Sequence, residues 1–186
     1  MDLGSNEKTF IELSQLNERI KKVKLLLLDV DGVLTDGAII YDNFKDELKN
    51  FNVYDGFGLV LLNKAGIRSA ILTAKASKIV KKRAHDMKIT KVYQNVSDKL
   101  KVYNKILKKF KVRDEEICFI GDELIDLPVI NKVGFAVSVP SAVSEVKARS
   151  HYITKSEGGK GAVRELVELI LKSQDKWDQI IGLYDR

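Results

Sequence analysis

A short apolar segment, Val23–Leu28, runs directly into the acidic sequence Asp29-Val30-Asp31-Gly32 and constrains the fold more than any other feature. Its last four residues are all leucine, which predicts a strand buried on both faces. Strands of this kind occur in parallel sheets that helices cover on both sides. The segment therefore predicts a central strand that ends at Asp29.

The rest of the chain alternates between short apolar segments and segments with helical periodicity. Further strands are predicted at residues 67–72, 91–93, 117–120, 134–137 and 152–153, and helices at 58–65, 76–87, 97–110, 141–148 and 161–173. Such alternation is typical of a doubly wound, mostly parallel α/β sheet of the Rossmann-like kind. We therefore expect that fold class.

Residues 38–54 interrupt the alternation. Two apolar segments, 38–41 and 48–53, flank a polar turn at Asp42-Asn43, which predicts a β-hairpin that projects from the domain. The other connections are too short for a lid, so no cap domain is expected. The length of 186 residues fits a single domain, predicted at 23–175 between an N-terminal helical extension (1–22) and a C-terminal tail (176–186).

Polar residues follow four of the predicted strands. Asp29 ends the first strand, Thr73 the second, Lys99 opens the helix after the third, and Asp122 follows the fourth. Ligands of doubly wound sheets bind outside the carboxyl ends of the strands. We therefore expect these side chains to face one crevice.

This set of groups suits phosphoryl transfer, which needs a nucleophile, a cation and hydrogen-bond donors. The Asp29 carboxylate is ionised at neutral pH and can attack phosphorus. Asp31 can lie on the same side of the loop, protonate the leaving oxygen and then deprotonate the attacking water. Asp29 and Asp122 together offer the hard oxygen ligands that Mg²⁺ prefers.

In this order, the motifs resemble the four motifs of the haloacid dehalogenase superfamily, namely Asp29–Gly37, Thr73, Lys99 and Gly121–Asp126. The resemblance spans the chain from the first strand to about residue 137. It implies a phosphatase domain at 23–175 with Asp29 as nucleophile and Asp31 as acid/base.

The same resemblance implies the remaining roles in the site. Mg²⁺ would be held by Asp29, the backbone carbonyl of Asp31 and Asp122. Thr73 and Lys99 would hold the phosphoryl group. From its position we expect Asp126 to support the site, either by binding the metal directly or by orienting Lys99 or the waters of the metal.

A closer resemblance, to the capless family of 3-deoxy-D-manno-octulosonate 8-phosphate phosphatases, is carried by Asp31–Gly37, Phe51–Gly58, Gly121–Pro128 and Gly158–Glu165. It implies hydrolysis of a phosphorylated sugar acid in lipopolysaccharide precursor synthesis. It also implies a homotetramer in which the hairpin packs against a neighbour's active site.

Two positions depart from that family's pattern. Lys75 stands where the family usually has arginine, and lysine keeps the charge but not the planar fork that binds a carboxylate. Glu123 replaces an aspartate. We interpret Lys75 and Lys160 as readers of the sugar's carboxylate, because Lys160 lies in a glycine-rich loop before a helix N-terminus.

Two alternatives to that substrate and activity stay open. A nine-carbon, sialic-acid-type sugar phosphate is the nearest alternative substrate, given Lys75. A phospho-Asp receiver or interaction module is the alternative from another class, although an acid/base at Asp31 would shorten the life of the acyl phosphate that a receiver needs.

The net charge of +6 comes with lysines spread along predicted helices, so we expect solvated helix faces rather than a nucleic-acid site. The longest unbroken apolar run, Leu25–Leu28, is far too short to span a membrane. The N-terminus lacks the plan of a signal peptide, and the single cysteine, Cys118, fits a reducing compartment. A cytoplasmic protein is expected.

Overall fold

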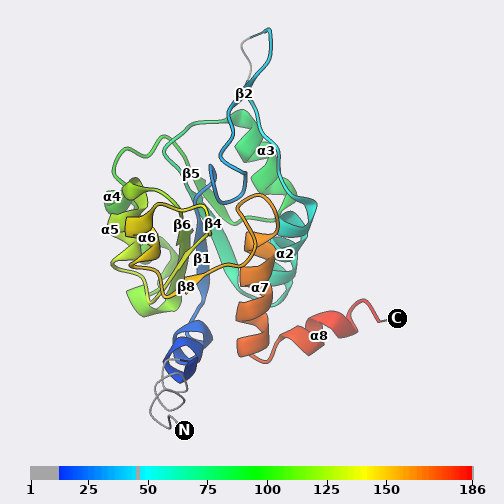
Figure 1. Ribbon diagram of the computed structural model, residues 1–186. Coiled ribbons are helices and arrows are strands. Elements are labelled where there is room, and N and C mark those ends of the chain that lie inside the picture. The colour runs from blue at the N-terminus through cyan, green and yellow to red at the C-terminus, as the bar shows by residue number, and fades with distance from the viewer. Residues whose placement is uncertain (1–12, 45–46, 186) are drawn as a thin grey trace, which may run out of the picture.

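The computed structural model describes residues 13–44 and 47–185. Its central element is a six-stranded sheet in the order β5-β4-β1-β6-β7-β8, with every neighbouring pair parallel (Figure 1). The strands are β1 (Leu25–Leu28), β4 (Arg68–Leu72), β5 (Lys91–Tyr93), β6 (Ile117–Gly121), β7 (Phe135–Ser138) and β8 (Tyr152–Ile153). The predicted doubly wound parallel sheet is confirmed.

Strand β1 lies at the centre of the sheet, between β4 and β6. All four of its leucines are fully buried, as the unbroken apolar run predicts. The chain first builds the sheet outward from β1 to β4 and β5, and then returns to add β6 on the other side. The order of the strands thus reverses between β1 and β6, which is where such sheets bind ligands.

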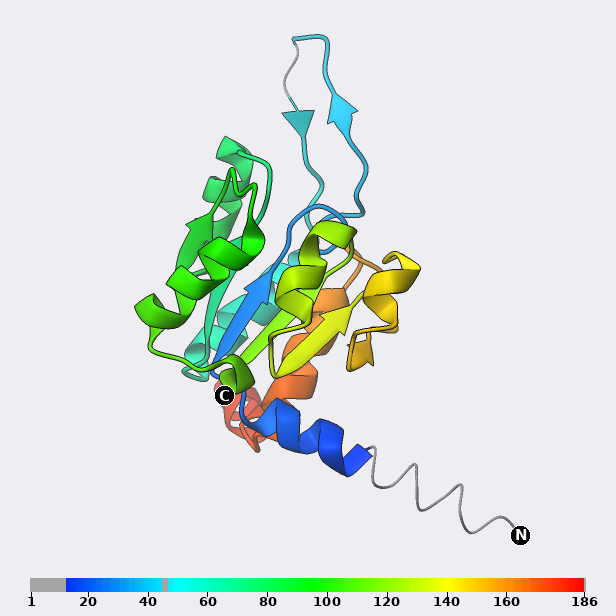
Figure 2. The same cartoon turned by 90° about the vertical axis from the view of Figure 1, so that its left-hand side faces the viewer.

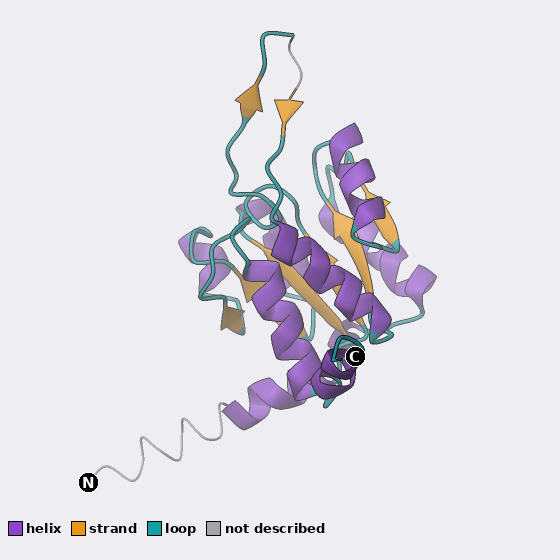
Figure 3. Ribbon diagram, turned by 90° about the vertical axis from the view of Figure 1, so that its right-hand side faces the viewer, coloured by secondary structure: helices purple, strands orange, loops and turns teal. Residues whose placement is uncertain are grey.

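Helices cover both faces of the sheet. Helices α2 (Val53–Lys64), α3 (Lys78–Asp86) and α7 (Ala162–Ser173) lie on one side, and α4 (Lys99–Phe110), α5 (Leu127–Ile130) and α6 (Ser144–Lys147) lie on the other (Figures 1 and 3). Short 3-10 turns at Asp114–Glu116 and Leu124–Asp126 flank β6. The strands thus end in loops that open on one rim of this three-layer domain.

The predicted hairpin projects beyond that rim (Figure 2). Its strands, β2 (Ile40–Tyr41) and β3 (Glu47–Leu48), are antiparallel and shorter than expected. Residues 48–53 do not all continue as strand, because the Asn52 side chain accepts hydrogen bonds from the backbone N–H groups of Tyr54 and Asp55 and caps α2. Helix α2 therefore begins five residues earlier than predicted.

No cap domain is present among the described residues. Between β1 and β4 the chain forms only the hairpin and α2, and between β4 and β5 only α3. The connections are therefore too short to form a lid, as predicted.

The terminal segments differ partly from expectation. Residues 13–21 are helical, and they belong to the segment 1–22 predicted as an N-terminal helical extension, of which residues 1–12 lie outside the described part. The expected tail contains a further helix, α8 (Trp177–Gly182), in which Ile180 is buried. Beyond it, Tyr184 accepts a hydrogen bond from Lys64 of α2 at 2.8 Å. Within the described ranges, no helix combines the length and apolar character required to cross a bilayer.

Candidate active site

The nucleophile candidate, Asp29, directly follows the central strand. Its side chain is almost completely buried, and its backbone N–H donates to the carbonyl of Ile120 in β6 at 3.1 Å. The loop then turns back on itself around Thr35, whose hydroxyl accepts from the backbone N–H groups of Gly32 and Gly37. This loop is held by its own hydrogen bonds as well as by the sheet.

Gly32 lets this loop approach the end of β6. It has φ +86°, a left-handed conformation that favours glycine. A Cβ at this position would collide with the carboxylate of Asp122. Because Gly32 has no side chain, the carboxylate of Asp122 can lie next to the Asp29 loop.

Three carboxylates meet at this point. Oxygen atoms of Asp29, Asp122 and Asp126 all lie within 4.8 Å of one another. Burial raises the pKa of Asp29 to about 6, because Lys99 only partly offsets burial and the charge of Asp126. Burial, together with the charges of Asp29 and Asp126, raises the pKa of Asp122 to about 7. The cluster therefore holds more negative charge than its protein partners neutralise.

Lys99 is the buried cation of this cluster. Its side chain is 1% exposed, and its Nζ lies 2.5 Å from Asp126 Oδ1 and 3.1 Å from Asp29 Oδ1. Burial lowers the pKa of Lys99, but the charges of Asp29 and Asp126 outweigh it and raise the pKa overall. Lys99 is thus held as a charged ammonium beside the nucleophile.

Asp126 organises its neighbours instead of facing the solvent. It is completely buried, and its second oxygen accepts from the backbone N–H groups of Asp122 and Glu123 at 3.0 and 3.2 Å. The same carboxylate therefore fixes both the Lys99 ammonium and the loop that carries Asp122.

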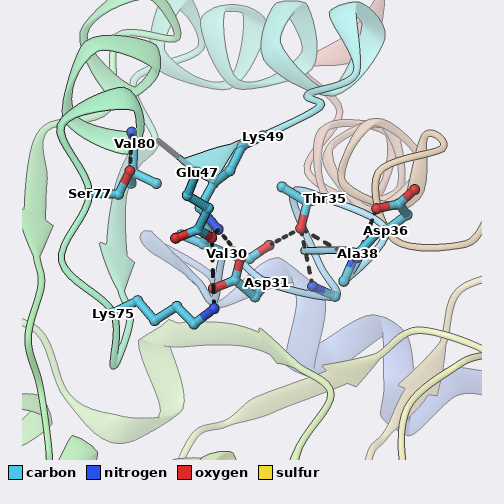
Figure 4. A network of polar contacts seen from close by, with 12 residues as sticks. Val30, Asp31, Thr35, Asp36, Ala38, Glu47, Lys49, Lys75, Ser77 and Val80 are labelled. Carbon is cyan, nitrogen blue, oxygen red and sulfur yellow. Dashed lines mark hydrogen bonds and ion pairs between the residues drawn. The ribbon is translucent and has the colours of Figure 1, made fainter. Parts of the chain in front are cut away.

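Asp31 points toward the hairpin (Figure 4). Its Oδ1 accepts a short hydrogen bond from Lys49, which also contacts Glu47 at 2.8 Å. Glu47 in turn lies 3.7 Å from the Nζ of Lys75. Burial lowers the pKa of Lys49, but the contacts with Asp31 and Glu47 raise it overall. Side chains of alternating charge thus connect Asp31, the acid/base candidate, with Lys75, which is expected to bind the carboxylate of the sugar.

A cavity of about 270 Å³ opens above these groups. Its lining comes from three of the four predicted motifs and lacks the Lys99 helix. The lining residues are Asp29, Asp31, Gly32, Gly37, Thr73, Ala74, Lys75, Asp122, Glu123 and Ile125. Lys99 and Asp126 lie buried beneath it. Lys160 is exposed and does not line the cavity, so its role as a reader of the carboxylate stays a prediction.

The glycine-rich loop 158–161 packs against the nucleophile loop. A Cβ on Gly158 would collide with the carbonyl oxygen of Gly32, and the N–H of Gly159 donates to the Val33 carbonyl at 2.9 Å. Buried Asp55 of α2 accepts from Gly161 N at 3.2 Å and fixes the loop. The loop thus supports the shape of the site.

Three residues of this arrangement escaped the reasoning from sequence: Glu47, Lys49 and Asp55. In the sequence, Lys49 is one charged residue among others in the predicted hairpin, and Asp55 stands within the Phe51–Gly58 motif without a role of its own. No local pattern predicts the contacts that these residues make.

The carboxylate cluster fits a magnesium ion. Asp29 Oδ1 and Asp122 Oδ1 are buried and accept no hydrogen bond from any residue that the structure describes, although the former is ion-paired with Lys99. Buried carboxylate oxygens without donors are costly unless a cation satisfies them. Hard oxygen ligands are those that Mg²⁺ takes, usually from one or two carboxylates with water completing the shell.

A parallel sheet with a carboxylate cluster at the junctions after β1 and β6 defines a class of phosphoryl-transfer hydrolase. In agreement, a family model described as haloacid dehalogenase-like hydrolase matches residues 63–166. A solved structure described as a putative haloacid dehalogenase superfamily (subfamily III A) hydrolase from Legionella pneumophila is 44% identical. It superposes with a TM-score of 0.92, covering 95% of this chain and 97% of that one.

Two other relatives are more specific. The 3-deoxy-D-manno-octulosonate 8-phosphate phosphatase KdsC of Yersinia pestis is 43% identical over 166 residues, 89% of each chain. The corresponding phosphatase of Moraxella catarrhalis, solved with magnesium, phosphate and KDO, is 40% identical with a TM-score of 0.90, covering 93% of this chain and 99% of that one. The chain therefore belongs to the haloacid dehalogenase-like hydrolases and, within them, to the family of 3-deoxy-D-manno-octulosonate 8-phosphate phosphatases.

Proposed function

We propose that the protein is a magnesium-dependent phosphatase that hydrolyses 3-deoxy-D-manno-octulosonate 8-phosphate to the free sugar acid and phosphate. The observation that carries this proposal is the meeting of Asp29 and Asp122 around the floor of an open cavity. The relatives named above supply the substrate, and their activity places the reaction in lipopolysaccharide precursor synthesis.

The residues divide the reaction into two displacements. In the first, the Asp29 carboxylate attacks phosphorus, Asp31 gives its proton to the sugar oxygen, and the bond between phosphorus and that oxygen breaks. In the second, Asp31 takes a proton from water, the water oxygen attacks phosphorus, and the aspartyl bond breaks to regenerate Asp29. Phosphate and the free sugar acid leave.

The surrounding groups offset charge and orient the substrate. Asp29, the Asp31 backbone carbonyl and Asp122 would hold Mg²⁺, which supplies positive charge against the repulsion between a carboxylate and a phosphate. Lys99 adds a second positive charge beside Asp29, at 3.1 Å. Thr73, on the cavity wall, donates its hydroxyl to a phosphoryl oxygen.

Lys75 is suited to the carboxylate of the sugar acid. It lines the cavity, and its side chain is 44% exposed, so it can reach a ligand. Because lysine reads a carboxylate as a point charge, the same position also accommodates a nine-carbon sugar acid.

The hairpin supports the further proposal of a homotetramer. Its exposed apolar side chains include Ile40, Tyr41, Phe44 and Leu48, with exposed fractions of 48, 70, 86 and 48%. Clustered apolar residues on a projection are typical of a protein–protein contact. A neighbour's hairpin would then cover the open cavity, and the assembly would work in the cytoplasm.

One set of assays tests the proposed activity. Phosphate release would be measured with the eight-carbon and the nine-carbon sugar-acid phosphates, with Mg²⁺ and then with the metal chelated. Magnesium-dependent turnover that favours the eight-carbon ester supports the proposal. A long-lived phosphoprotein without turnover would instead favour a receiver, and preference for the nine-carbon ester would correct the substrate.

A further inference from the structure

Lys49 of the hairpin lies in an unusual environment for a lysine. Its side chain is 2% exposed, although the residue belongs to a short, projecting element. A buried ammonium without partners is costly, so it stays buried only where anions compensate it. Here the compensating anions are Asp31 and Glu47.

The two anions fix the lysine from different elements. Asp31 belongs to the nucleophile loop after β1, whereas Glu47 belongs to β3 and lies 2.8 Å from the ammonium. In Figure 4, Lys49 reaches down from the hairpin to the carboxylate of Asp31. Lys49 does not line the cavity itself. It contacts Asp31, which lines the cavity, directly, and it is connected to Lys75, which also lines it, through Glu47.

From this geometry we infer that Lys49 is the positioning residue of the acid/base: it holds the Asp31 carboxyl toward the leaving oxygen, and Glu47 holds Lys49. The inference rests on the proposed function, because it assigns a residue to the same reaction. Through Lys49, the hairpin would then contribute to proton transfer in the active site of its own chain.

A physical reason links this contact to rate. When Asp31 gives its proton to the sugar oxygen, negative charge develops on its carboxylate. An ammonium already in place stabilises that charge in the transition state more than in the ground state, which is the condition for acceleration. A carboxyl freed from its partner would also sample orientations away from the leaving oxygen.

The test compares two leaving groups. A sugar phosphate leaves as an alkoxide and needs the proton, whereas p-nitrophenyl phosphate leaves as a weakly basic phenolate and needs little help. For Lys49→Met, we expect kcat/KM to fall about 10- to 100-fold with the sugar phosphate but less than about threefold with the aryl phosphate. Lys49→Arg, which keeps the charge, should recover most of the loss.

The matched control removes a lysine from another ion pair. Lys24 lies 2.6 Å from Glu116 at the opposite end of β1, so Lys24→Met should leave the ratio of the two kcat/KM values unchanged. In an Asp31→Asn background, Lys49→Met should lower kcat/KM no further, because that variant has no carboxyl proton donor for Lys49 to position. Should Lys49→Met not fold, Lys49→Gln gives the same comparison, because it also removes the ammonium, with an expected change in the ratio of about threefold or more.

Several results would overturn the inference. These are an equal loss on both esters, no loss on either, no recovery with arginine, or an undiminished effect in the Asp31→Asn background. They remain distinct from failure of the proposed function, which would appear as a wild-type protein that hydrolyses neither ester with Mg²⁺.

Discussion

The Lys99 ammonium lies 2.5 Å from Asp126 Oδ1, and both side chains are buried beneath the cavity. The other oxygen of Asp126 accepts the backbone N–H of Asp122. One carboxylate thus connects the cation beside the nucleophile with the loop that carries the candidate metal ligand.

Asp126→Asn should therefore weaken both connections. We expect magnesium affinity to fall about 10- to 100-fold, as for other changes to residues behind metal ligands, and kcat to fall with it. Isothermal titration with Mg²⁺ and steady-state kinetics would measure the two effects. Asp114→Asn, which alters a carboxylate 2.5 Å from the Tyr103 hydroxyl at the far end of β6, is the control that should leave magnesium affinity unchanged.

Asp29→Asn should abolish turnover while the fold is retained. The amide cannot form the acyl phosphate, so we expect kcat to fall at least about 10⁴-fold. Phosphate-release assays measure the loss, and circular dichroism checks the fold. Appreciable residual turnover would rule out Asp29 as nucleophile.

Gly32→Ala should damage the metal site more than backbone strain alone would. Gly32 and Gly66 have similar left-handed φ values, +86° and +80°, but a Cβ on Gly66 meets no atom within 4 Å. Both substitutions should cost about 1 kcal/mol or more of unfolding free energy, from the conformation. Only Gly32→Ala should displace Asp122 and lower magnesium affinity, and equal affinities in the two variants would refute this.

The stability of the metal-free protein should fall as the pH rises from about 4 to 7. Asp29 and Asp122 have folded-state pKa values of about 6 and about 7 against an ordinary value of 3.8, so the folded state binds more protons across this range. Stability therefore decreases with rising pH, because deprotonation costs more in the folded state. Thermal unfolding of the chelated protein between pH 4 and 8 would measure the slope.

Magnesium should reverse that trend, because it binds the deprotonated carboxylates. The rise in Tm that Mg²⁺ produces should be larger at pH 8 than at pH 5. The Asp29→Asn/Asp122→Asn double variant should show a flatter slope without metal and little response to Mg²⁺. A magnesium response independent of pH would contradict the assignment of these carboxylates as ligands.

Phe44→Ser should weaken the proposed homotetramer. Phe44 is 86% exposed on the hairpin, and a buried phenylalanine contributes about 1.5–3 kcal/mol at each contact. Light scattering coupled to gel filtration should then show a smaller species at micromolar concentration. Leu13→Ser, at an exposed apolar position outside the hairpin, is the control. A monomeric wild-type protein would refute the tetramer itself.

Most of the fold could be predicted from the sequence because its signals are local. The buried run Leu25–Leu28, the helical periodicities and the short connections predicted a capless parallel sheet with a hairpin, and the structure has them. The start of α2 was missed because Asn52 caps the helix and Gly56 and Gly58 lie inside it. These glycines weaken a helix locally, but a Cβ would crowd Arg83 at Gly56 and Arg164 at Gly58.

The residues of the candidate site likewise fall into two groups, those that the sequence predicted and those that only the structure brought into contact. The sequence by itself determined which groups stand at the strand ends, since Asp29, Thr73, Lys99 and Asp122 each follow a strand or open a helix next to one. Only the tertiary structure decided that Lys49 contacts Asp31, that Asp55 fixes the glycine loop, and that Lys160 does not line the cavity. Those contacts join residues from different elements, and their burial and charge compensation exist only once the chain has folded.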